Sequence, residues 1–99
     1  MPAYIVQFED NEDFASERKR HMAAHLGFLD VNAAAITAAG PLLVPDTGAG
    51  AGGLWLVTAE SSSEVEALVH ADPFWPTGLR KSFRVLQWKQ VFKDGKRMI

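Results

Sequence analysis

The chain contains no cysteine among its 99 residues. This absence excludes a disulfide framework, a thiol nucleophile and any cysteine-ligated metal site. The chain also lacks an apolar run close to the roughly 20 residues that span a bilayer, and it begins without a charged-then-apolar export signal. Hydrophobic residues make up 47% of the chain and charged residues 22%, which is typical of a folded domain. We therefore expect a single cytoplasmic domain over residues 1–99.

Neither sign of charge dominates the chain. Lys and Arg number 10 and Asp and Glu number 12, which gives a formal net charge of -2 at pH 7. A protein with this balance has no general attraction for the phosphate backbone of nucleic acid or for an anionic membrane surface. The composition therefore predicts neither a nucleic-acid partner nor a membrane partner.

The periodicity of the apolar residues predicts the order strand, helix, strand, strand, helix, strand. β-branched and aromatic residues alternate in the first strand, which places Tyr4, Val6 and Phe8 on one face. Ser61-Ser62-Ser63-Glu64 is a capping box that opens the second helix. The expected strands cover 3–9, 35–43, 53–59 and 82–92, and the first helix runs from about 12 to 31 with an apolar stripe of Phe14, Met22, Leu26 and Leu29. Residues 93–97 are expected to form a solvated tail.

This order is that of the ferredoxin-like βαββαβ fold, an α+β architecture in which an antiparallel sheet carries two helices on one face. The predicted strands are nevertheless apolar on both faces, since Leu54 and Leu56 alternate with Trp55 and Val57. A solvated sheet face normally shows polar side chains at alternate positions. We therefore expect a second copy of the sheet to cover the open face in a two-fold homodimer. The alternative is that the C-terminal segment folds back over that face.

Two segments far apart in the sequence supply a candidate proton-transfer pair. At about 100° per residue, His25 falls inside the apolar arc of the first helix, together with Arg18. Pro73 disfavours a helical backbone at the preceding residue, so Asp72 is expected at or just beyond the end of the second helix. Both helices lie on the same sheet face in this fold, which makes contact between His25 and Asp72 feasible. The alternatives are a purely structural buried hydrogen bond, or an Asp72 that only caps a turn.

A series of short motifs makes the chain similar to one known family. The motifs are an Arg-rich helix with His25-Leu26-Gly27-Phe28-Leu29, then Ala39-Gly40-Pro41-Leu42, then Asp72-Pro73-Phe74 with Gly78-Leu79, and finally Val85 and Trp88. In order and spacing this series resembles the YCII-related (YciI-like) family over nearly the whole chain. The resemblance implies a dimeric α+β barrel with His25 and Asp72 as its active-site dyad. Dehydrochlorination of a chlorinated, hydroxylated aromatic is known among the members. The chain departs from many of them at Met22, where they carry an Arg.

These observations together predict a small-molecule enzyme of the lyase or isomerase type. His25 would act as general acid or base on a small cyclic or aromatic substrate, with Asp72 fixing its tautomer and stabilising the imidazolium. Arg18 would hold a carboxylate or phenolate oxygen, unless it forms only a surface ion pair. The candidates for the walls of the substrate pocket, with core or dimer packing as the alternative for each, are Phe74, Trp75, Leu79 and Trp88.

Other functions stay open on the sequence alone. A non-catalytic dimeric module of the same fold would bind a small ligand without turnover, and a haem-binding barrel would use His25 as an axial ligand. The run 48–53 contains a GxGxxG pattern, but it leads into a strand rather than a helix and is interpreted as a flexible loop or lid. His21 has the i, i+4 spacing of a zinc pair with His25, yet it lies at the edge of the polar face and is expected to be solvated. We therefore expect neither a cofactor nor a bound metal.

Overall fold

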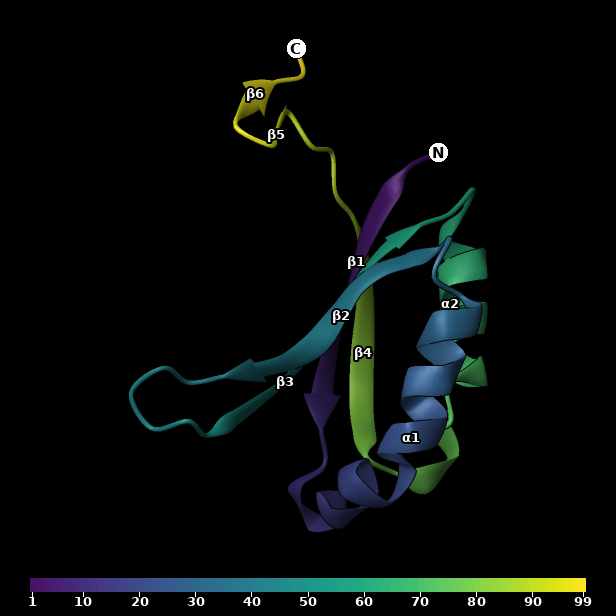
Figure 1. Cartoon of the computed structure of the whole chain (residues 1–99), viewed down its shortest axis with the longest axis vertical. Coiled ribbons are helices and arrows are strands. Elements are labelled where there is room, and N and C mark those ends of the chain that lie inside the picture. The colour runs from purple at the N-terminus through teal and green to yellow at the C-terminus, as the bar shows by residue number, and fades with distance from the viewer.

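The computed structural model describes residues 1–99 and consists of a four-stranded antiparallel sheet with two α-helices on one face (Figure 1). The strands are β1 (Ala3–Asp10), β2 (Ile36–Leu43), β3 (Gly50–Thr58) and β4 (Arg80–Gln87), in the spatial order β2-β3-β1-β4. The helices are α1 (Ser16–Val31) and α2 (Ser62–Ala71), with short 3₁₀ turns η1 (Glu12–Phe14) and η2 (Trp75–Thr77). A small hairpin of β5 (Phe92–Lys93) and β6 (Lys96–Arg97) ends the chain. This topology confirms the predicted ferredoxin-like α+β fold.

The hydrophobic core lies between the sheet and the helices. Strand β1 directs Tyr4, Val6 and Phe8 into this layer, as its alternating pattern predicts. Trp55 and Val57 on β3 pair with Val6 and Tyr4 and are also buried. The rings of Phe8 and Trp55 meet edge to face, with their centroids 5.0 Å apart. The remaining buried members of the cluster are Ile36, Ala59, Val65 and Val69.

Helix α2 begins at the capping box that the sequence predicts. The side-chain oxygen of Ser61 accepts a hydrogen bond from the Glu64 backbone N–H at 3.3 Å. The Glu64 carboxylate in turn accepts one from the Glu60 N–H at 2.9 Å. The helix ends before Asp72, whose backbone is extended (φ -63°, ψ 130°), as the following Pro73 favours. Asp72 therefore lies at the end of α2, as predicted.

The first helix differs from the prediction in its start and in its buried face. The 3₁₀ turn η1 precedes α1, so the segment from residue 12 to 31 is not one continuous helix. Phe14 and Leu26 were expected in the apolar stripe, but they are 42% and 51% exposed. The buried residue of α1 is His25, while Phe28 and Leu29 pack against the core with part of their surface exposed. Neither α1 nor α2 has the length and apolar character needed to cross a bilayer.

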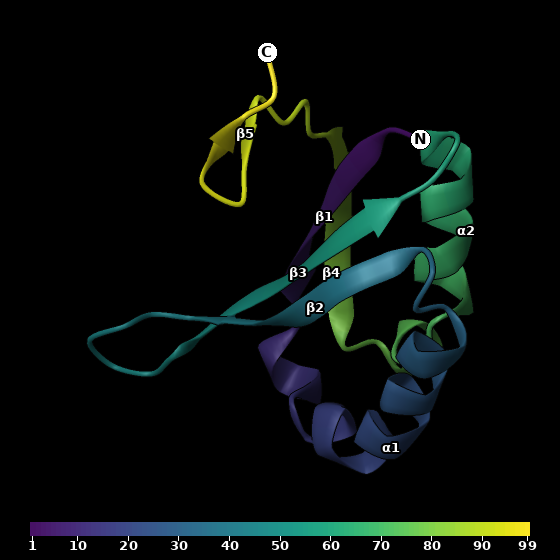
Figure 2. The same ribbon diagram turned by 45° about the horizontal axis from the view of Figure 1, so that its top comes forward.

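Strands β2 and β3 continue past the helical layer as a long hairpin (Figure 2). Gly52 lies in this hairpin with φ +90°, and a Cβ atom at this position would come within 2.0 Å of the Phe8 carbonyl oxygen. Only glycine tolerates both the backbone conformation and the close approach. The run 48–53 was interpreted as a flexible loop or lid, but its residues 50–53 form the start of β3, where glycine allows the strand to pass close to β1. This is not the strand-to-helix context that dinucleotide binding requires.

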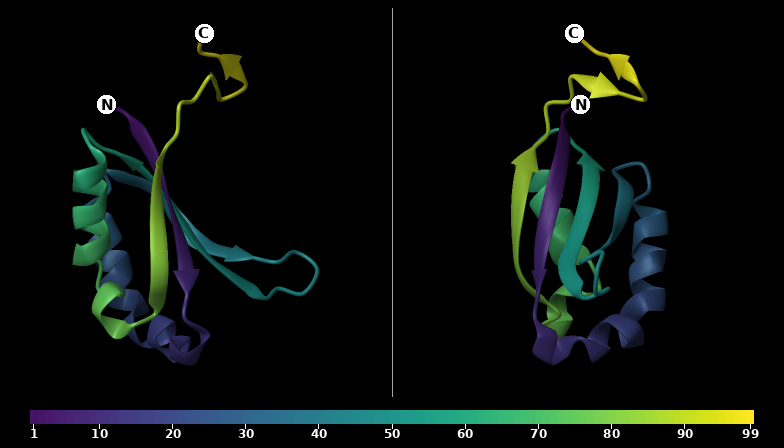
Figure 3. Two further views of the ribbon diagram at one scale, coloured as in Figure 1. Left: turned by 180° about the vertical axis from the view of Figure 1, so that it is seen from behind. Right: turned by 90° about the vertical axis from the view of Figure 1, so that its left-hand side faces the viewer.

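The C-terminal part departs from the strand predicted over 82–92. Strand β4 begins at Arg80 and ends at Gln87, and the N–H of Trp88 donates to the carbonyl oxygen of Ala3 at 2.8 Å. Beyond this point the chain forms the β5–β6 hairpin rather than a simple tail, turning at Asp94 and Gly95 with positive φ angles. The hairpin projects from the end of the sheet (Figures 1 and 3). The C-terminal segment therefore does not fold back over the open face.

No helix or strand covers the sheet face opposite the two helices (Figure 3). Ile5 lies between Leu56 of β3 and Leu86 of β4 in the antiparallel register, and all three are only partly buried. Their neighbours at alternate positions face the core. The prediction that these strands are apolar on both faces is therefore confirmed.

Candidate active site

His25 and Asp72 lie in direct contact although they are 47 positions apart in the chain. The Nδ1 atom of His25 is 2.8 Å from the Oδ1 atom of Asp72. Both residues are buried, with 7% and 2% of their surface exposed. The predicted meeting of the imidazole and the carboxylate is confirmed, while their catalytic role remains a prediction.

The turn after α2 fixes the orientation of the Asp72 carboxylate. Its Oδ1 atom accepts a second hydrogen bond from the backbone N–H of Phe74 at 3.1 Å. An ionised carboxylate only accepts hydrogen bonds, so the Nδ1 atom of His25 is the donor in their contact. A proton on Nδ1 leaves the lone pair of Nε2 available, and Nε2 has no hydrogen-bond partner within the chain. The pair therefore presents one nitrogen that can accept a proton.

Phe74 holds the plane of the His25 ring. The two rings are stacked, with their centroids 4.1 Å apart and their planes inclined by 16°. The sequence suggested Phe74 as a wall of the substrate pocket. In the structure Phe74 is instead fully buried beneath the imidazole. Its contribution is to restrict rotation of the His25 ring and so to keep the direction of Nε2 constant.

Arg80 is a third buried polar residue of the site, and the sequence analysis did not single it out. Its Nη1 atom donates to the Asp10 Oδ1 atom at 3.2 Å, and its Nη2 atom lies 4.0 Å from the Oδ2 atom of Asp72. Burial lowers the pKa of the Arg80 guanidinium, whereas the negative charges of Asp10 and Asp72 oppose this shift. Arginine nevertheless remains protonated in proteins. The site therefore contains a permanent buried cation.

An irregularity in the pairing of β1 with β4 explains why Arg80 points inward. The pairing is regular up to Glu9 and Ser82, and the register then shifts so that Asp10 lies opposite Arg80. With strict alternation, Arg80 would lie on the face opposite that of Phe83, which packs against the core. The only feature of the sequence that indicates this contact is the opposite charge of Asp10 and Arg80 at facing strand ends.

Arg18 reaches the same group of charges from α1. It forms an ion pair with the Oδ2 atom of Asp10, and its guanidinium lies 5.6 Å from the centre of the Phe74 ring. The Asp10 carboxylate is therefore shared between Arg18 and Arg80. Because Arg18 and Asp10 are both partly buried, their contact differs from the simple surface ion pair that was the alternative.

A cavity of about 110 Å³, the His25 cavity, opens beside the imidazole. Its lining residues are Arg18, Met22, His25, Leu26, Leu29, Ala39, Gly40, Pro41, Trp55 and Arg80. The lining combines apolar side chains with two guanidinium groups and the imidazole, and it includes no carboxylate. A closed cavity of about 150 Å³ is known to hold benzene. The His25 cavity is therefore of a size to receive one edge of a substituted ring.

A larger open groove of about 930 Å³ shares Arg18 with the His25 cavity. Residues of the β2–β3 hairpin and of the η1 turn line it, including Gly52 and Asp13. Neither His25 nor Asp72 reaches this groove. We therefore place the candidate active site in the smaller His25 cavity, where the proton-accepting nitrogen is.

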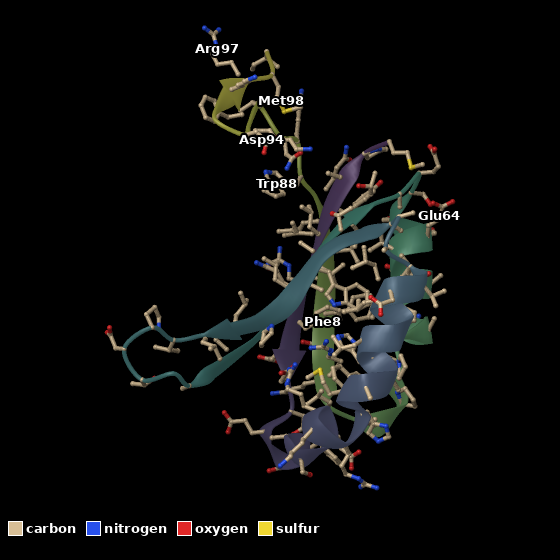
Figure 4. The ribbon with its side chains drawn as sticks, in the orientation of Figure 1. Phe8, Glu64, Trp88, Asp94, Arg97 and Met98 are labelled. Atoms are coloured by element: carbon tan, nitrogen blue, oxygen red, sulfur yellow. The ribbon has the colours of Figure 1, made fainter.

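The other predicted wall residues do not line the His25 cavity. Leu79 is buried and borders the larger groove. Trp75 packs edge-on against Phe83, with the ring centroids 5.5 Å apart. Trp88 is 45% exposed and lies near the C-terminal hairpin, far from Phe8 in the core (Figure 4). The structure thus brings together His25, Asp72, Arg18 and Phe74 from the predicted set.

The residues around His25 do not favour a metal or a haem. His21 contacts Glu17 at 3.0 Å on the more exposed side of α1, and the structure contains no group of three potential ligands that could hold a metal ion. The Nε2 atom of His25 is free, but the cavity beside it is far smaller than a haem.

The sequence and the fold are similar to those of known proteins. The model of the YCII-related domain matches residues 3–89. The structure is similar to 5-chloro-2-hydroxyhydroquinone dehydrochlorinase from Burkholderia phenoliruptrix, solved in complex with 2,5-dihydroxybenzoquinone; the identity is 32%, the match covers 88% of this chain and 93% of that chain, and the TM-score is 0.77. A protein from Arabidopsis thaliana shows a weaker likeness, with 13% identity over 91% of this chain and 95% of that chain and a TM-score of 0.47. No curated protein matches the chain.

Proposed function

This chain belongs to the YCII-related family, and we propose that it is a small-molecule enzyme in which the His25–Asp72 pair transfers a proton. The expected reaction is of the lyase or isomerase type, on a small cyclic or aromatic substrate. The observation that carries the proposal is the buried 2.8 Å contact between His25 and Asp72, which leaves Nε2 without a partner on a ring that lines a cavity. The dehydrochlorinase with 32% identity supports the same class of chemistry.

The proposed reaction begins when the Nε2 atom of His25 takes a proton from an activated C–H or O–H group of the substrate. The electron pair of the broken bond moves into the ring system and forms an enolate or a new π bond. In an elimination, a leaving group on the neighbouring carbon departs with its bonding electrons. In an isomerisation, the imidazolium returns the proton to a different atom. Throughout, Asp72 stabilises the imidazolium and keeps Nδ1 protonated.

Arg18 is proposed to hold a carboxylate or phenolate oxygen of the substrate. It lines the His25 cavity, and its ion pair with Asp10 fixes its direction. Met22, which stands where many family members carry an arginine, supplies an apolar part of the lining instead. Recognition of a substrate anion in this chain therefore has to come from Arg18 or from another cation of the cavity.

A panel of small ring compounds tests the proposed function. We expect the wild-type protein to convert at least one member of a set of chlorinated hydroquinones, halogenated phenols and lactones, as measured by halide release or by a change in the ultraviolet spectrum. Thermal stabilisation by a ligand without any product would instead indicate a binding module of the same fold. A protein that neither converts nor is stabilised by any member contradicts both functions.

We also propose that a second copy of the chain covers the open face of the sheet. Ile5, Leu56 and Leu86 form an apolar stripe at the centre of that face. Contiguous apolar surface on a water-soluble domain marks an interaction site, and an identical sheet offers a self-complementary partner. The expected assembly is a two-fold dimer with the helices on its outside.

Replacing Leu56 with lysine is expected to convert this dimer to a monomer of 10.9 kDa. The ammonium group would be buried at the interface without a partner, which costs far more than the lost apolar contact. Light scattering after size-exclusion chromatography measures the change. Val31→Lys is the matched control, because Val31 is 85% exposed at the end of α1 and should leave the dimer intact. A wild-type protein that elutes as a monomer contradicts the proposal.

A further inference from the structure

Arg80 is buried beside the proposed proton-transfer pair, yet its hydrogen-bonding capacity is largely unused. Its Nη1 atom donates to Asp10, but its Nη2 atom stays 4.0 Å from the Asp72 Oδ2 atom, beyond hydrogen-bond distance. The Nε atom of Arg80 and the Oδ2 atom of Asp72 are both buried without a hydrogen-bond partner. Buried polar groups in native proteins are almost always satisfied. Unused donors on a side chain that lines a cavity therefore point to a ligand.

The charge of the His25 cavity indicates the sign of that ligand. Arg18 and Arg80 both line the cavity, and no carboxylate lines it. Asp10 bridges the two guanidinium groups from outside the cavity and holds them near one another despite their repulsion. The rest of the lining is apolar, with Trp55 and Leu29 among its members. A flat, largely apolar molecule with a negatively charged oxygen matches this surface.

Arg80 and His25 are held by the same two groups. The guanidinium of Arg80 lies 4.0 Å from the centre of the Phe8 ring and 5.3 Å from that of Phe74, and Phe74 also stacks beneath His25. Asp72 contacts His25 through Oδ1 and faces Arg80 through Oδ2. The proton-accepting nitrogen and the cation are therefore fixed relative to each other by a shared ring and a shared carboxylate.

We infer that Arg80 binds an anionic oxygen carried by the ring of the substrate. The inference rests on the proposed function, because it describes what the proton-transfer site holds. The oxygen receives hydrogen bonds from Arg80 while His25 moves a proton at another position of the same ring. When that proton leaves, negative charge spreads onto the oxygen, and a fixed buried cation stabilises the charge as it develops.

The binding of two matched probes tests this inference. 4-Nitrophenolate, in mildly alkaline buffer, carries the anionic oxygen, and 4-nitroanisole is the uncharged analogue with the same nitro-substituted ring. We expect the wild-type protein to bind the phenolate at least about tenfold more tightly than the anisole, as measured by calorimetry, because hydrogen bonds to charged groups are the stronger ones. Equal binding of the two probes, or no binding of the phenolate, overturns the inference.

Variants of Arg80 then test whether this residue causes the preference for the phenolate over the anisole. Arg80→Met should remove most of the preference for the phenolate while binding of the anisole persists, and Arg80→Lys should retain part of it. Arg20→Met is the matched control, because Arg20 is exposed on α1 and should keep the full preference. A folded Arg80→Met protein with the wild-type preference overturns the inference. If Arg80→Met fails to fold, the inference is still tested by the relative binding of the two probes to the wild-type protein and to Arg80→Lys.

The two proposals fail in different ways. If the protein prefers the phenolate through Arg80 but converts no substrate, the anion site is supported and the proposed enzymatic function is contradicted. If the protein instead converts ring compounds equally well with and without an ionised oxygen, the enzymatic function is supported and the inferred role of Arg80 is contradicted.

Discussion

Replacing His25 with asparagine is expected to lower kcat about 10²–10⁴-fold on any substrate that the wild-type protein converts. The amide of asparagine can donate a hydrogen bond toward Asp72, as the Nδ1 atom of His25 does at 2.8 Å. The amide has no nitrogen that accepts a proton at neutral pH. Since the lost interaction belongs to the transition state, the decrease should appear in kcat with little change in KM.

Initial rates over a range of substrate concentrations measure this effect. His21→Asn is the matched control, because His21 lies on the same helix, pairs with Glu17 and does not line the His25 cavity. Circular dichroism and urea denaturation establish that the variant is folded. An undiminished kcat in folded His25→Asn protein would remove His25 from the mechanism.

The sequence predicted the contact between His25 and Asp72 because local rules determine both positions. Helical periodicity places His25 on the inner side of α1, and Pro73 ends α2 at Asp72. The topology then brings both helices to one face of the sheet. Periodicity described the apolar stripe of α1 less well, because α1 lies beside the β2 edge and leaves Leu26 half exposed next to the cavity.

The role of Arg80 could not be predicted from periodicity. The strand expected over 82–92 leaves out Arg80, and its side-chain period of two, continued back to residue 80, would place Arg80 on the solvent side. A register shift opposite Asp10 turns the guanidinium inward, onto the ring of Phe8. Such a shift depends on the geometry of a strand pair, which is a property of the folded sheet and leaves no periodic trace in the sequence.

The local sequence pattern also did not predict the residue at which β4 ends. The strand was expected over 82–92, a range that includes Trp88 and Val91 among its apolar residues. A strand extends only where a neighbour supplies hydrogen bonds, and β1 begins at Ala3, the partner of Trp88. The predicted strand therefore stops at the start of β1, and Trp88 lies away from the candidate site.

Replacing Asp72 with alanine is expected to lower the free energy of unfolding by about 3–5 kcal/mol, the usual cost of breaking a buried ion pair by removing one partner. The carboxylate is 2% exposed and accepts hydrogen bonds from His25 and from the backbone N–H of Phe74. Its removal leaves that N–H without its partner and leaves Arg80 with Asp10 as its only nearby carboxylate. Because a domain of this kind is stable by only about 5–15 kcal/mol, urea denaturation should show a large shift in midpoint.

Three further variants test the role of Asp72: one separates its charge from its hydrogen bonds, one is a control and one combines two substitutions. Asp72→Asn keeps an acceptor for the Phe74 N–H, removes the charge and replaces the oxygen that faces Arg80 with an NH2 donor, and it should cost less than alanine. Asp13→Ala, at an exposed carboxylate in η1, should change stability by no more than about 0.5 kcal/mol. Combining Asp72→Ala with Arg80→Met should cost less than the sum of the single variants, because the double variant no longer buries an unbalanced cation. Strict additivity would mean that Asp72 and Arg80, whose charged atoms lie 4.0 Å apart, do not stabilise each other, and that the cation is held by Asp10 and the two phenylalanine rings.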